Sequence, residues 1–346
     1  MKNNTIFCWC SNLEFDNGEG ILGRTFVEKI FNQKKTQLII KTNLGEYLYK
    51  NNKFILKKKN YFPEFLKKYF LPFYGIFFLI VKNLQNYKTV YINYLPLWNF
   101  VIFFLLPKKT IIGPITGTTV INSKKIFNLI FRKYLMKIFF KISLNIIHRK
   151  YTKYIFSTEN LKKLIKQKYK KKCIFNFCFQ CINFNKNIKK KNIDFIFYLK
   201  DHKNKTNSLL VQYIKLLANR NYKIYVVGDS FKFRKVKNLG FIKRNELKKI
   251  LKRSKFAINS GENLYSLFAL DCYSSNVIIF NDIKLMPENA VLNRYNFRFI
   301  DLNNFTNTIK KLTRIYKLYK VKKIDNKKIK NLNFKNQNQI KKIITL

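Results

Sequence analysis

The stretch Ile193–Leu210, IDFIFYLKDHKNKTNSLL, shows the folding pattern of the second half of the chain most clearly. Asp194–Leu199 is an apolar run typical of a buried strand, and the pattern from Ser208 onward is helical. Lys200 and Lys205 lie in the loop between them. Strands that alternate with helices are typical of βαβ units, so this stretch predicts an α/β fold with a parallel sheet.

The same alternation continues toward the C-terminus. Asn245 is a candidate N-cap for a helix whose apolar residues share one face. The other predicted elements of this half are strands at Lys223–Gly228, Phe256–Asn259 and Val277–Phe280, and helices at Ser208–Arg220 and Thr306–Tyr319.

The first half follows the same pattern, and a polar stretch at 169–192 separates the two halves. We therefore expect one domain at 1–185, a second at 186–320 and a basic tail at 321–346. The predicted strands are Thr5–Cys10, Gln37–Thr42, Thr89–Asn93, Thr110–Ile112 and Tyr154–Ser157, and the predicted helices are Ile21–Phe31, Leu97–Leu106 and Leu161–Tyr169.

The composition is strongly basic, with 70 Lys and Arg against 17 Asp and Glu and a formal net charge of +53. Such a balance favours an anionic partner. The lysines are scattered in ones to threes along the chain, however. Lys, Asn, Ile, Phe and Tyr are all abundant and share AT-rich codons, so much of the positive charge reflects the base composition of the genome. The cations of a nucleic-acid-binding surface are clustered, so no nucleic-acid partner is expected.

The six cysteines do not form a disulfide framework, and the Cys178-x-x-Cys181 pair lacks the second pair that a zinc site needs.

Two segments are unusually apolar, Phe70–Val81 and Phe100–Leu106. Both are shorter than the roughly 18–20 residues that span a bilayer, and the N-terminus lacks the apolar region of a signal peptide. The segments are either core elements or faces that lie on an anionic membrane, with nearby lysines at the headgroups. A cytoplasmic protein is expected, with peripheral attachment to the inner face of the cell membrane as the second interpretation. The lysines concerned are Lys67, Lys68, Lys133, Lys137 and Lys141.

The order of motifs in the second half resembles the C-terminal domain of GT-B glycosyltransferases, particularly the retaining family-four kind. Lys200 and Lys205 stand at that family's Arg-x4-Lys spacing. The two acids Glu262 and Asp271 stand near its Glu-x7-Glu segment, but nine residues apart rather than eight. Either Glu262 or Asn263 therefore takes the place of the first acid. Gly228, Gly240 and Glu246 fall where the intervening family elements belong.

The resemblance implies two Rossmann-like domains that face each other across a cleft, with a nucleotide-sugar donor bound by the second. The lysines would neutralise the leaving diphosphate, Asp271 would hold the ribose hydroxyls, and Glu262 or Asn263 would contact the sugar. The implied catalytic residues are Glu262, Lys205 and Lys200, and the implied donor-binding residues are Asp271, Asn263, Leu264, Tyr265, Ser266 and Gly228.

In the first half, Gly18-x-Gly20-x-x-Gly23 follows a strand and precedes Arg24 and a helix. A dinucleotide fingerprint would add an acidic residue at the end of the next strand, but that strand ends in Lys41 and Thr42. The family resemblance instead implies a glycine loop at the cleft. The later segment 93–119, with Gly113-Pro114 and Gly117 after a strand, resembles a subset of bacterial cell-surface polysaccharide transferases. This resemblance implies acceptor-side contacts by Asn93, Trp98 and Thr116.

The sequence has no obvious general base. Its only histidines are His148 and His202, and Asp16 and Glu19 are the candidate carboxylates for an inverting mechanism. The absence of a clear base favours a retaining hexosyltransferase, and neither a metal nor a cofactor is expected. The sequence thus predicts transfer of a sugar from a nucleotide diphosphate donor to a glycan or lipid-linked acceptor, in surface polysaccharide or lipopolysaccharide assembly. The alternatives are a GT-B sugar-nucleotide epimerase and a non-enzymatic protein that binds nucleic acid or a membrane surface.

Overall fold

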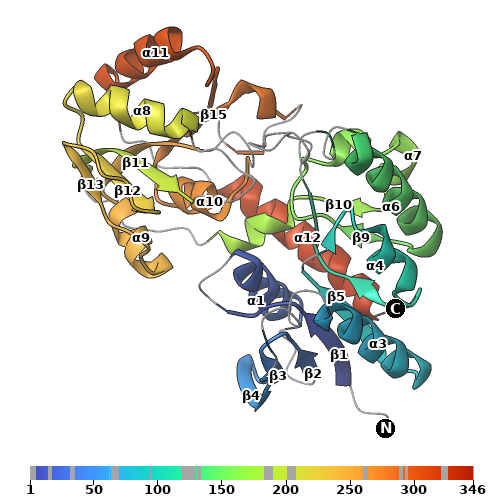
Figure 1. Cartoon of the computed structure of the whole chain (residues 1–346). Helices are drawn as coiled ribbons and strands as arrows, with labels where there is room; N and C mark the ends of the chain where they lie inside the picture. Colours follow the sequence, from blue (N-terminus) through green and yellow to red (C-terminus); the bar gives the residue numbers. More distant parts are fainter. Residues whose placement is uncertain are drawn as a thin grey trace. The chain divides into compact units, whose positions relative to one another are not determined.

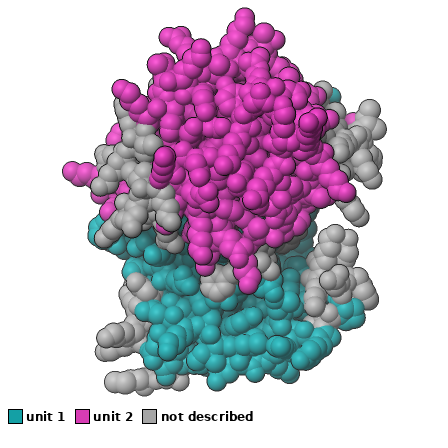
Figure 2. All heavy atoms as spheres, turned by 90° about the vertical axis from the view of Figure 1, so that its left-hand side faces the viewer, with its two compact units in different colours: residues 1–119, 132–181, 332–346 teal, residues 120–131, 182–331 magenta. Residues whose placement is uncertain are grey.

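A computed structural model of the chain shows an α/β protein that divides into two compact units (Figures 1 and 2). Unit 1 comprises Met1–Thr119, Arg132–Cys181 and Leu332–Leu346, and unit 2 comprises Val120–Phe131 and Ile182–Asn331. The structure describes residues 5–14, 18–31, 36–61, 63, 70–93, 95–117, 130, 134–182, 190–200, 208–259, 264–287, 291–292, 295–320 and 326–345.

Unit 1 is built on a six-stranded sheet of order β4-β3-β2-β1-β5-β7. Its parallel part consists of β1 (Thr5–Cys10), β2 (Gln37–Lys41), β5 (Lys88–Ile92) and β7 (Ile111–Ile112). An antiparallel hairpin of β3 (Gly45–Lys50) and β4 (Lys53–Lys59) extends the β2 edge.

The central strand β1 sends alternate side chains to opposite faces of this sheet. Trp9 packs in the core under α3 (Leu71–Leu84), where an added Cβ on Gly75 would lie 2.2 Å from the indole ring. On the other face, α1 (Gly18–Ile30) packs against the short helix η3 (Phe177–Cys181), with the rings of Phe26 and Phe177 5.2 Å apart.

Shorter elements complete unit 1. Two helices, α4 (Phe100–Leu105) and α6 (Met136–Lys150), pack against each other. The remaining elements are the strand pairs β6 (Leu95–Pro96) with β8 (Ile115–Thr116) and β9 (Tyr154–Ile155) with β10 (Cys173–Ile174), and the short helices η2 (Lys162–Leu164) and α7 (Gln167–Lys170).

Unit 2 has a six-stranded sheet of order β13-β12-β11-β14-β15-β16 in which every pair is parallel. Numbered from β11, this is the order 3-2-1-4-5-6 of a Rossmann domain. The strands are β11 (Ile193–Leu199), β12 (Ile224–Gly228), β13 (Val236–Asn238), β14 (Ser254–Ile258), β15 (Ile278–Asp282) and β16 (Phe297–Ile300).

Helices cover both faces of this sheet (Figure 1). On one face lie α8 (Ser208–Asn219) and α11 (Phe305–Lys317), which meet where the rings of Tyr213 and Phe305 are 4.8 Å apart. On the other lie α9 (Arg244–Leu251) and α10 (Leu267–Ser274), and Phe268 of α10 stacks on Tyr198 of β11. A short helix, η4 (Ile283–Leu285), follows β15.

The last helix, α12 (Lys327–Thr345), occupies the segment predicted as a basic tail. From Leu332 onward it belongs to unit 1, where Asn336 donates to the Phe175 carbonyl and Gln337 donates to Gln180. Ile340 is fully buried. The predicted domain boundary at 185/186 lies outside the described residues, and the two units divide between Cys181 and Ile182.

The predicted α/β class with two Rossmann-like parallel-sheet domains is confirmed. The continuous helix predicted at Leu161–Tyr169 is wrong, because Ile165 takes an extended conformation that buries its side chain and separates η2 from α7. The N-cap role of Asn245 is also wrong, since Lys243 occupies that position and Asn245 lies in the first turn of α9.

Candidate functional site

The strand order of unit 2 changes direction between β11 and β14, which makes this point the topological switch point of the sheet. The connections that follow the two strands leave in opposite directions there, so the carboxyl ends of the strands open a crevice for ligands. Lys200 follows β11 directly and is exposed, and Asn259 follows β14. The candidate site of unit 2 is therefore this carboxyl edge of the sheet.

Gly228 lets the end of β12 pack closely against the end of β11. Its φ is +105°, and an added Cβ would lie 1.8 Å from the Leu199 carbonyl oxygen. The amide of Gly228 donates to the carbonyl of Gly240 at 2.9 Å, and the amide of Asp229 donates to Leu199 at 2.9 Å. Gly228 thus shapes the backbone immediately beside Lys200, at the position where the sequence predicted a donor contact.

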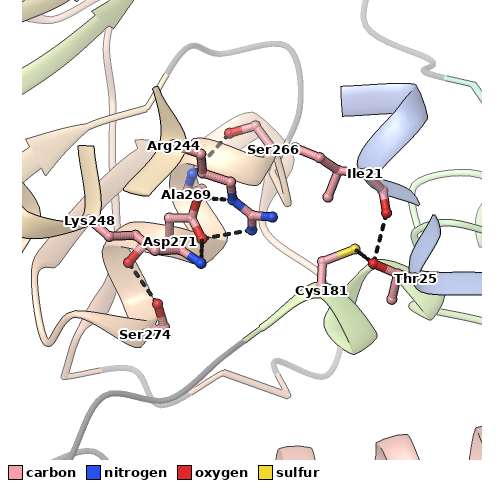
Figure 3. Close-up of polar contacts among 9 residues, drawn as sticks. All are labelled: Ile21, Thr25, Cys181, Arg244, Lys248, Ser266, Ala269, Asp271 and Ser274. Carbon is pink, nitrogen blue, oxygen red and sulfur yellow. Dashed lines mark hydrogen bonds and ion pairs between the residues drawn. The ribbon is translucent and has the colours of Figure 1, made fainter. Parts of the chain in front are cut away.

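A buried amide network fixes the loop between β14 and α10. The Nδ2 atom of Asn259 donates to the Asn281 Oδ1 atom at 3.0 Å and to the Leu264 carbonyl at 3.3 Å. The hydroxyl of Ser266 donates to the Asn259 Oδ1 atom at 3.2 Å and accepts from the Ala269 amide at 3.1 Å, which caps α10 (Figure 3). The network orients the N-terminus of α10, whose dipole favours an anion.

Two of the predicted donor residues, Leu264 and Tyr265, have buried side chains. Tyr265 stacks on Phe297 with ring centroids 5.8 Å apart. Their side chains thus belong to the packing of unit 2, which leaves backbone groups for any contact with a ligand.

Asp271, on the second turn of α10, is 2% exposed and forms an ion pair with α9 (Figure 3). The Arg244 guanidinium binds both carboxylate oxygens, with Nε–Oδ2 at 2.7 Å and Nη2–Oδ1 at 2.8 Å. The Lys248 ammonium lies 3.9 Å from Oδ1. Sequence reasoning missed Arg244, although Arg244 and Lys248 stand at the i, i+4 spacing that places two cations on one face of a helix.

A buried cation, Lys191, joins the C-terminal ends of the same two helices. The Lys191 ammonium donates to the Ser275 carbonyl at 2.8 Å and to the Leu251 carbonyl at 3.3 Å. Burial lowers the pKa of Lys191 to about 8. Cationic groups at both ends of α9 therefore hold it against α10. Asp271 of α10 is the residue predicted to bind the ribose.

Several predicted residues lie outside the described part of the chain. They include the catalytic candidates Lys205 and Glu262, the sugar-contact candidate Asn263, and also Asp16 and His202. Their roles stay predictions, as do the roles of Lys200 and Asp271.

In unit 1, the glycines of Gly18-x-Gly20-x-x-Gly23 lie in α1 rather than in a loop, because the helix begins at Gly18. An added Cβ on Gly20 would lie 2.1 Å from the Glu14 carbonyl oxygen. On Gly23 it would lie 2.8 Å from the Asn93 Nδ2 atom and 2.9 Å from the Cys10 sulfur. These two glycines allow α1 to pack directly on the loop that precedes it.

Asn93 ties this loop to the switch point of unit 1, between β1 and β5. Its Oδ1 atom accepts from the amide and the hydroxyl of Ser11, at 3.2 and 2.8 Å. Its Nδ2 atom donates to the carbonyls of Asn12 and Glu19, at 3.2 and 2.7 Å. Asn93 is 1% exposed and has a φ of +50°. The amide thus positions the backbone of the loop, and the predicted contact with an acceptor stays a prediction.

The other predicted residues of unit 1 have separate surroundings. The Arg24 Nε atom donates to the Leu13 carbonyl, and the guanidinium lies 4.6 Å from the centroid of the Phe54 ring. Burial lowers the pKa of Arg24. Trp98 is 39% exposed, and the carbonyl of Thr116 accepts from the Leu97 amide at 2.9 Å.

Cysteine and histidine in unit 1 serve packing. The Cys181 thiol donates to the Thr25 hydroxyl at 3.4 Å, and that hydroxyl donates to the Ile21 carbonyl at 2.7 Å (Figure 3). The imidazole of His148 stacks on Tyr169 at 3.8 Å and bonds the Tyr154 hydroxyl. Burial, together with nearby lysines, lowers the pKa of His148 to about 4.

Two further searches cover only the part of the chain that the structure describes. None of those helices has the length and apolar composition needed to cross a lipid bilayer. No group of three or more His, Cys, Asp and Glu is placed there to hold a metal ion.

No protein-family model and no curated protein matches the sequence. Among solved structures, the chain is similar to the UDP-GlcNAc 2-epimerase of Methanocaldococcus jannaschii in complex with UDP-GlcNAc and UDP, at 12% identity and a TM-score of 0.53 over 99% of both chains. It is also similar to a putative UDP-N-acetylglucosamine 2-epimerase from Listeria monocytogenes, at 8% identity and a TM-score of 0.52 over 99% of this chain and 96% of that one. A glycosyltransferase from Rickettsia africae ESF-5 is less similar, at 13% identity and a TM-score of 0.48 over 100% of this chain and 94% of that one. The two epimerases with TM-scores above 0.5 share the fold of this chain. The chain therefore has a two-domain fold of the GT-B type.

Proposed function

We propose that this protein is a GT-B glycosyltransferase that binds a nucleotide diphosphate-sugar at the switch point of unit 2. The observation that carries the proposal is the all-parallel 3-2-1-4-5-6 sheet with Lys200 at the carboxyl end of its first strand. Ligands of open α/β sheets bind at this place. The likeness to an epimerase in complex with UDP-GlcNAc and UDP supports a nucleotide-sugar ligand.

The chemistry of transfer explains why cations are needed at this edge. When the sugar leaves, negative charge develops on the β-phosphate of the departing diphosphate, and preorganised donors lower the barrier by stabilising that charge. Lys200 and Lys205 supply two ammonium groups in the loop after β11, and α10 directs its amide-rich end toward the same group. Glu262 or Asn263 contacts the sugar hydroxyls, and Asp271 accepts from the ribose.

Asp271 can combine this role with the ion pair to Arg244. Each carboxylate oxygen has two lone-pair directions, and the guanidinium uses one on each oxygen. In this proposal Arg244 orients Asp271. Because the carboxylate is only 2% exposed, the partly exposed Arg244 side chain has to shift before the ribose hydroxyls bind the remaining lone pairs.

The acceptor in this proposal is a glycan or a lipid-linked sugar, and the product belongs to a surface polysaccharide or lipopolysaccharide. The reaction retains the anomeric configuration, with the leaving phosphate in place of a protein base. The protein works in the cytoplasm, attached peripherally at the inner face of the cell membrane.

A sugar-nucleotide 2-epimerase is the second candidate, because the structural likenesses above a TM-score of 0.5 include two such enzymes. Epimerisation moves protons on the sugar itself and therefore needs acid and base groups near it. The chain has only 17 acidic residues and two histidines, and His148 is stacked in the packing of unit 1. This scarcity favours transfer.

One experiment separates the two activities. Purified protein is incubated with each member of a nucleotide-sugar panel, with and without a membrane extract that contains lipid-linked acceptors, and the products are resolved by chromatography. A transferase releases nucleoside diphosphate far faster when the extract is present. An epimerase converts the nucleotide sugar to a second isomer without the extract, and that result would replace the transferase proposal.

A further inference from the structure

The helix α6 carries two apolar stripes, although a helix at the surface of a domain needs only one. Its core stripe consists of Phe140, Leu144 and Ile147, which are buried. On another side of the helix, Ile138 and Ile142 are exposed. The exposed Leu135 lies three residues before Ile138 and seven before Ile142, which places all three on one side of the helix. Ile138 is 52% exposed. This second stripe is available to a partner.

Cations border the exposed stripe. Lys137 and Lys141 are exposed and stand at the i, i+4 spacing, which places them on one side of the helix beside Ile138. We call the surface formed by Leu135, Ile138, Ile142, Lys137 and Lys141 the α6 face. On the neighbouring helix α4, Phe104 is also exposed, at 66%. The two helices are joined where the Lys150 ammonium donates to the Phe104 carbonyl at 2.6 Å.

The sequence around the α6 face contains no opposing charge. No Asp or Glu occurs between Glu64 and Glu159, although Lys and Arg recur throughout that interval. A second copy of this chain would bring Lys137 and Lys141 against similar cations, so self-association is disfavoured. Nucleic acid would use the cations but leaves the aliphatic stripe unused, since bases stack on aromatic rings.

We propose that the α6 face docks on an anionic lipid surface, with Leu135, Ile138 and Ile142 among the acyl chains and Lys137 and Lys141 at the headgroups. An interfacial helix combines an apolar side with lysines in this way, and anionic headgroups attract the cations. The proposal deepens the peripheral location given above and rests on the proposed function only for the idea of a lipid-linked acceptor.

The test must separate the α6 face from the general attraction of a protein with a net charge of +53. We therefore compare two variants with the same change in charge. One is Lys137→Gln/Lys141→Gln on α6, and the other is Lys310→Gln/Lys317→Gln, which removes two exposed lysines from α11 of unit 2. A third variant, Ile138→Gln/Ile142→Gln, removes the apolar stripe and keeps the charge.

Flotation measures binding to vesicles of phosphatidylcholine with phosphatidylglycerol, and to phosphatidylcholine alone, over a series of salt concentrations. We expect the full chain to bind the anionic vesicles, the α6 lysine variant to bind about 10-fold or more weakly, and the α11 variant to match the wild type. The isoleucine variant should lose the binding that persists at high salt, because screening removes the electrostatic part first.

Equal losses in the two lysine variants would overturn the proposal, as would wild-type binding by the isoleucine variant at high salt. Absence of wild-type binding to anionic vesicles, with tight binding to duplex DNA instead, would also overturn it and favour a nucleic-acid partner. No nucleotide sugar is present in this experiment, so these outcomes do not affect the transferase proposal.

Discussion

The guanidinium of Arg244 binds both carboxylate oxygens of Asp271, a residue 27 positions later in the chain. The contact joins the start of α9 to the second turn of α10 and buries the carboxylate almost completely. The pair gives Asp271 a fixed orientation at the candidate donor site, and it makes the stability of unit 2 sensitive to the loss of either partner.

Removal of the cation should be the more damaging change. In Arg244→Met the buried carboxylate loses both guanidinium hydrogen bonds and keeps only the Lys248 ammonium, 3.9 Å away. We therefore expect the free energy of unfolding to fall by about 3 kcal/mol. Asp271→Asn should cost less, because Arg244 is partly exposed and can turn to water. Urea unfolding of both variants and of the double variant measures this. A double variant less stable than Arg244→Met would contradict the buried ion pair.

The same variants test the ribose assignment of Asp271. Both break the ion pair, but only Asp271→Asn removes the charged acceptor, and a hydrogen bond to a charged group contributes about 1.5–3 kcal/mol. Calorimetry with UDP, well below the unfolding temperature, should show weaker binding in Asp271→Asn than in Arg244→Met. Equal affinities in the two variants would leave Asp271 with a structural role alone.

The lysines of the β11–α8 loop should control turnover rather than stability. Lys205→Ala and Lys200→Ala should each lower turnover by about 10²-fold, the scale for one lost donor to a developing charge. Lys215→Ala, which changes an exposed lysine on the following helix, is the matched control and should keep wild-type rates. Wild-type turnover in the two loop variants would remove the phosphate assignment.

Asn93 should stabilise unit 1 through its amide more than through its backbone conformation. Asn93→Ala leaves the groups of Ser11, Asn12 and Glu19 without their partner and adds strain at positive φ. Asn93→Gly relieves the strain, which contributes roughly 1 kcal/mol. Thermal unfolding should therefore show a large loss in both variants, with glycine only slightly better. Recovery to wild-type stability in the glycine variant would show that the amide network contributes little.

His148 should make the fold less stable in acid. Its pKa is near 4 in the folded protein, below its ordinary value of 6.5. Between these values the unfolded chain binds a proton that the folded chain does not, so the free energy of unfolding falls as the pH falls from about 6.5 to 4. His148→Phe keeps a ring against Tyr169 but cannot titrate. Unfolding at a series of pH values should show a shallower decline in this variant, and parallel curves would contradict the shifted pKa.

The sequence predicted most of the parallel strands, because buried β-branched and aromatic runs such as Thr5–Cys10 have few other structures open to them. The β3–β4 hairpin is absent from these predictions, although the sequence contains a hairpin signal. Alternating residues flank Asn51 and Asn52, which both adopt the positive φ of a tight hairpin turn.

The sequence predicts less of the candidate functional site than of the fold. The partners of Asn93 and Asp271 are 82 and 27 residues away, and spacing along one element cannot reveal pairs that meet only after the sheets form. The GxGxxG pattern illustrates the same limit. The pattern predicts a loop near a ligand, but Gly20 and Gly23 are required by the packing of α1 on the loop that precedes it.

The central claim is that a nucleotide sugar binds at the carboxyl edge of the unit 2 sheet beside Lys200. Titration calorimetry of UDP and other nucleoside diphosphates, with wild type and with Lys200→Glu at equal ionic strength, tests it most directly. Reversal of a charge beside the diphosphate should weaken binding at least about 10-fold, since one lost charge-assisted contact exceeds 1.4 kcal/mol. The account predicts saturable one-to-one binding to the wild type and this loss in the variant. Undiminished binding in Lys200→Glu, or no binding of any nucleoside diphosphate to the wild type, would contradict it.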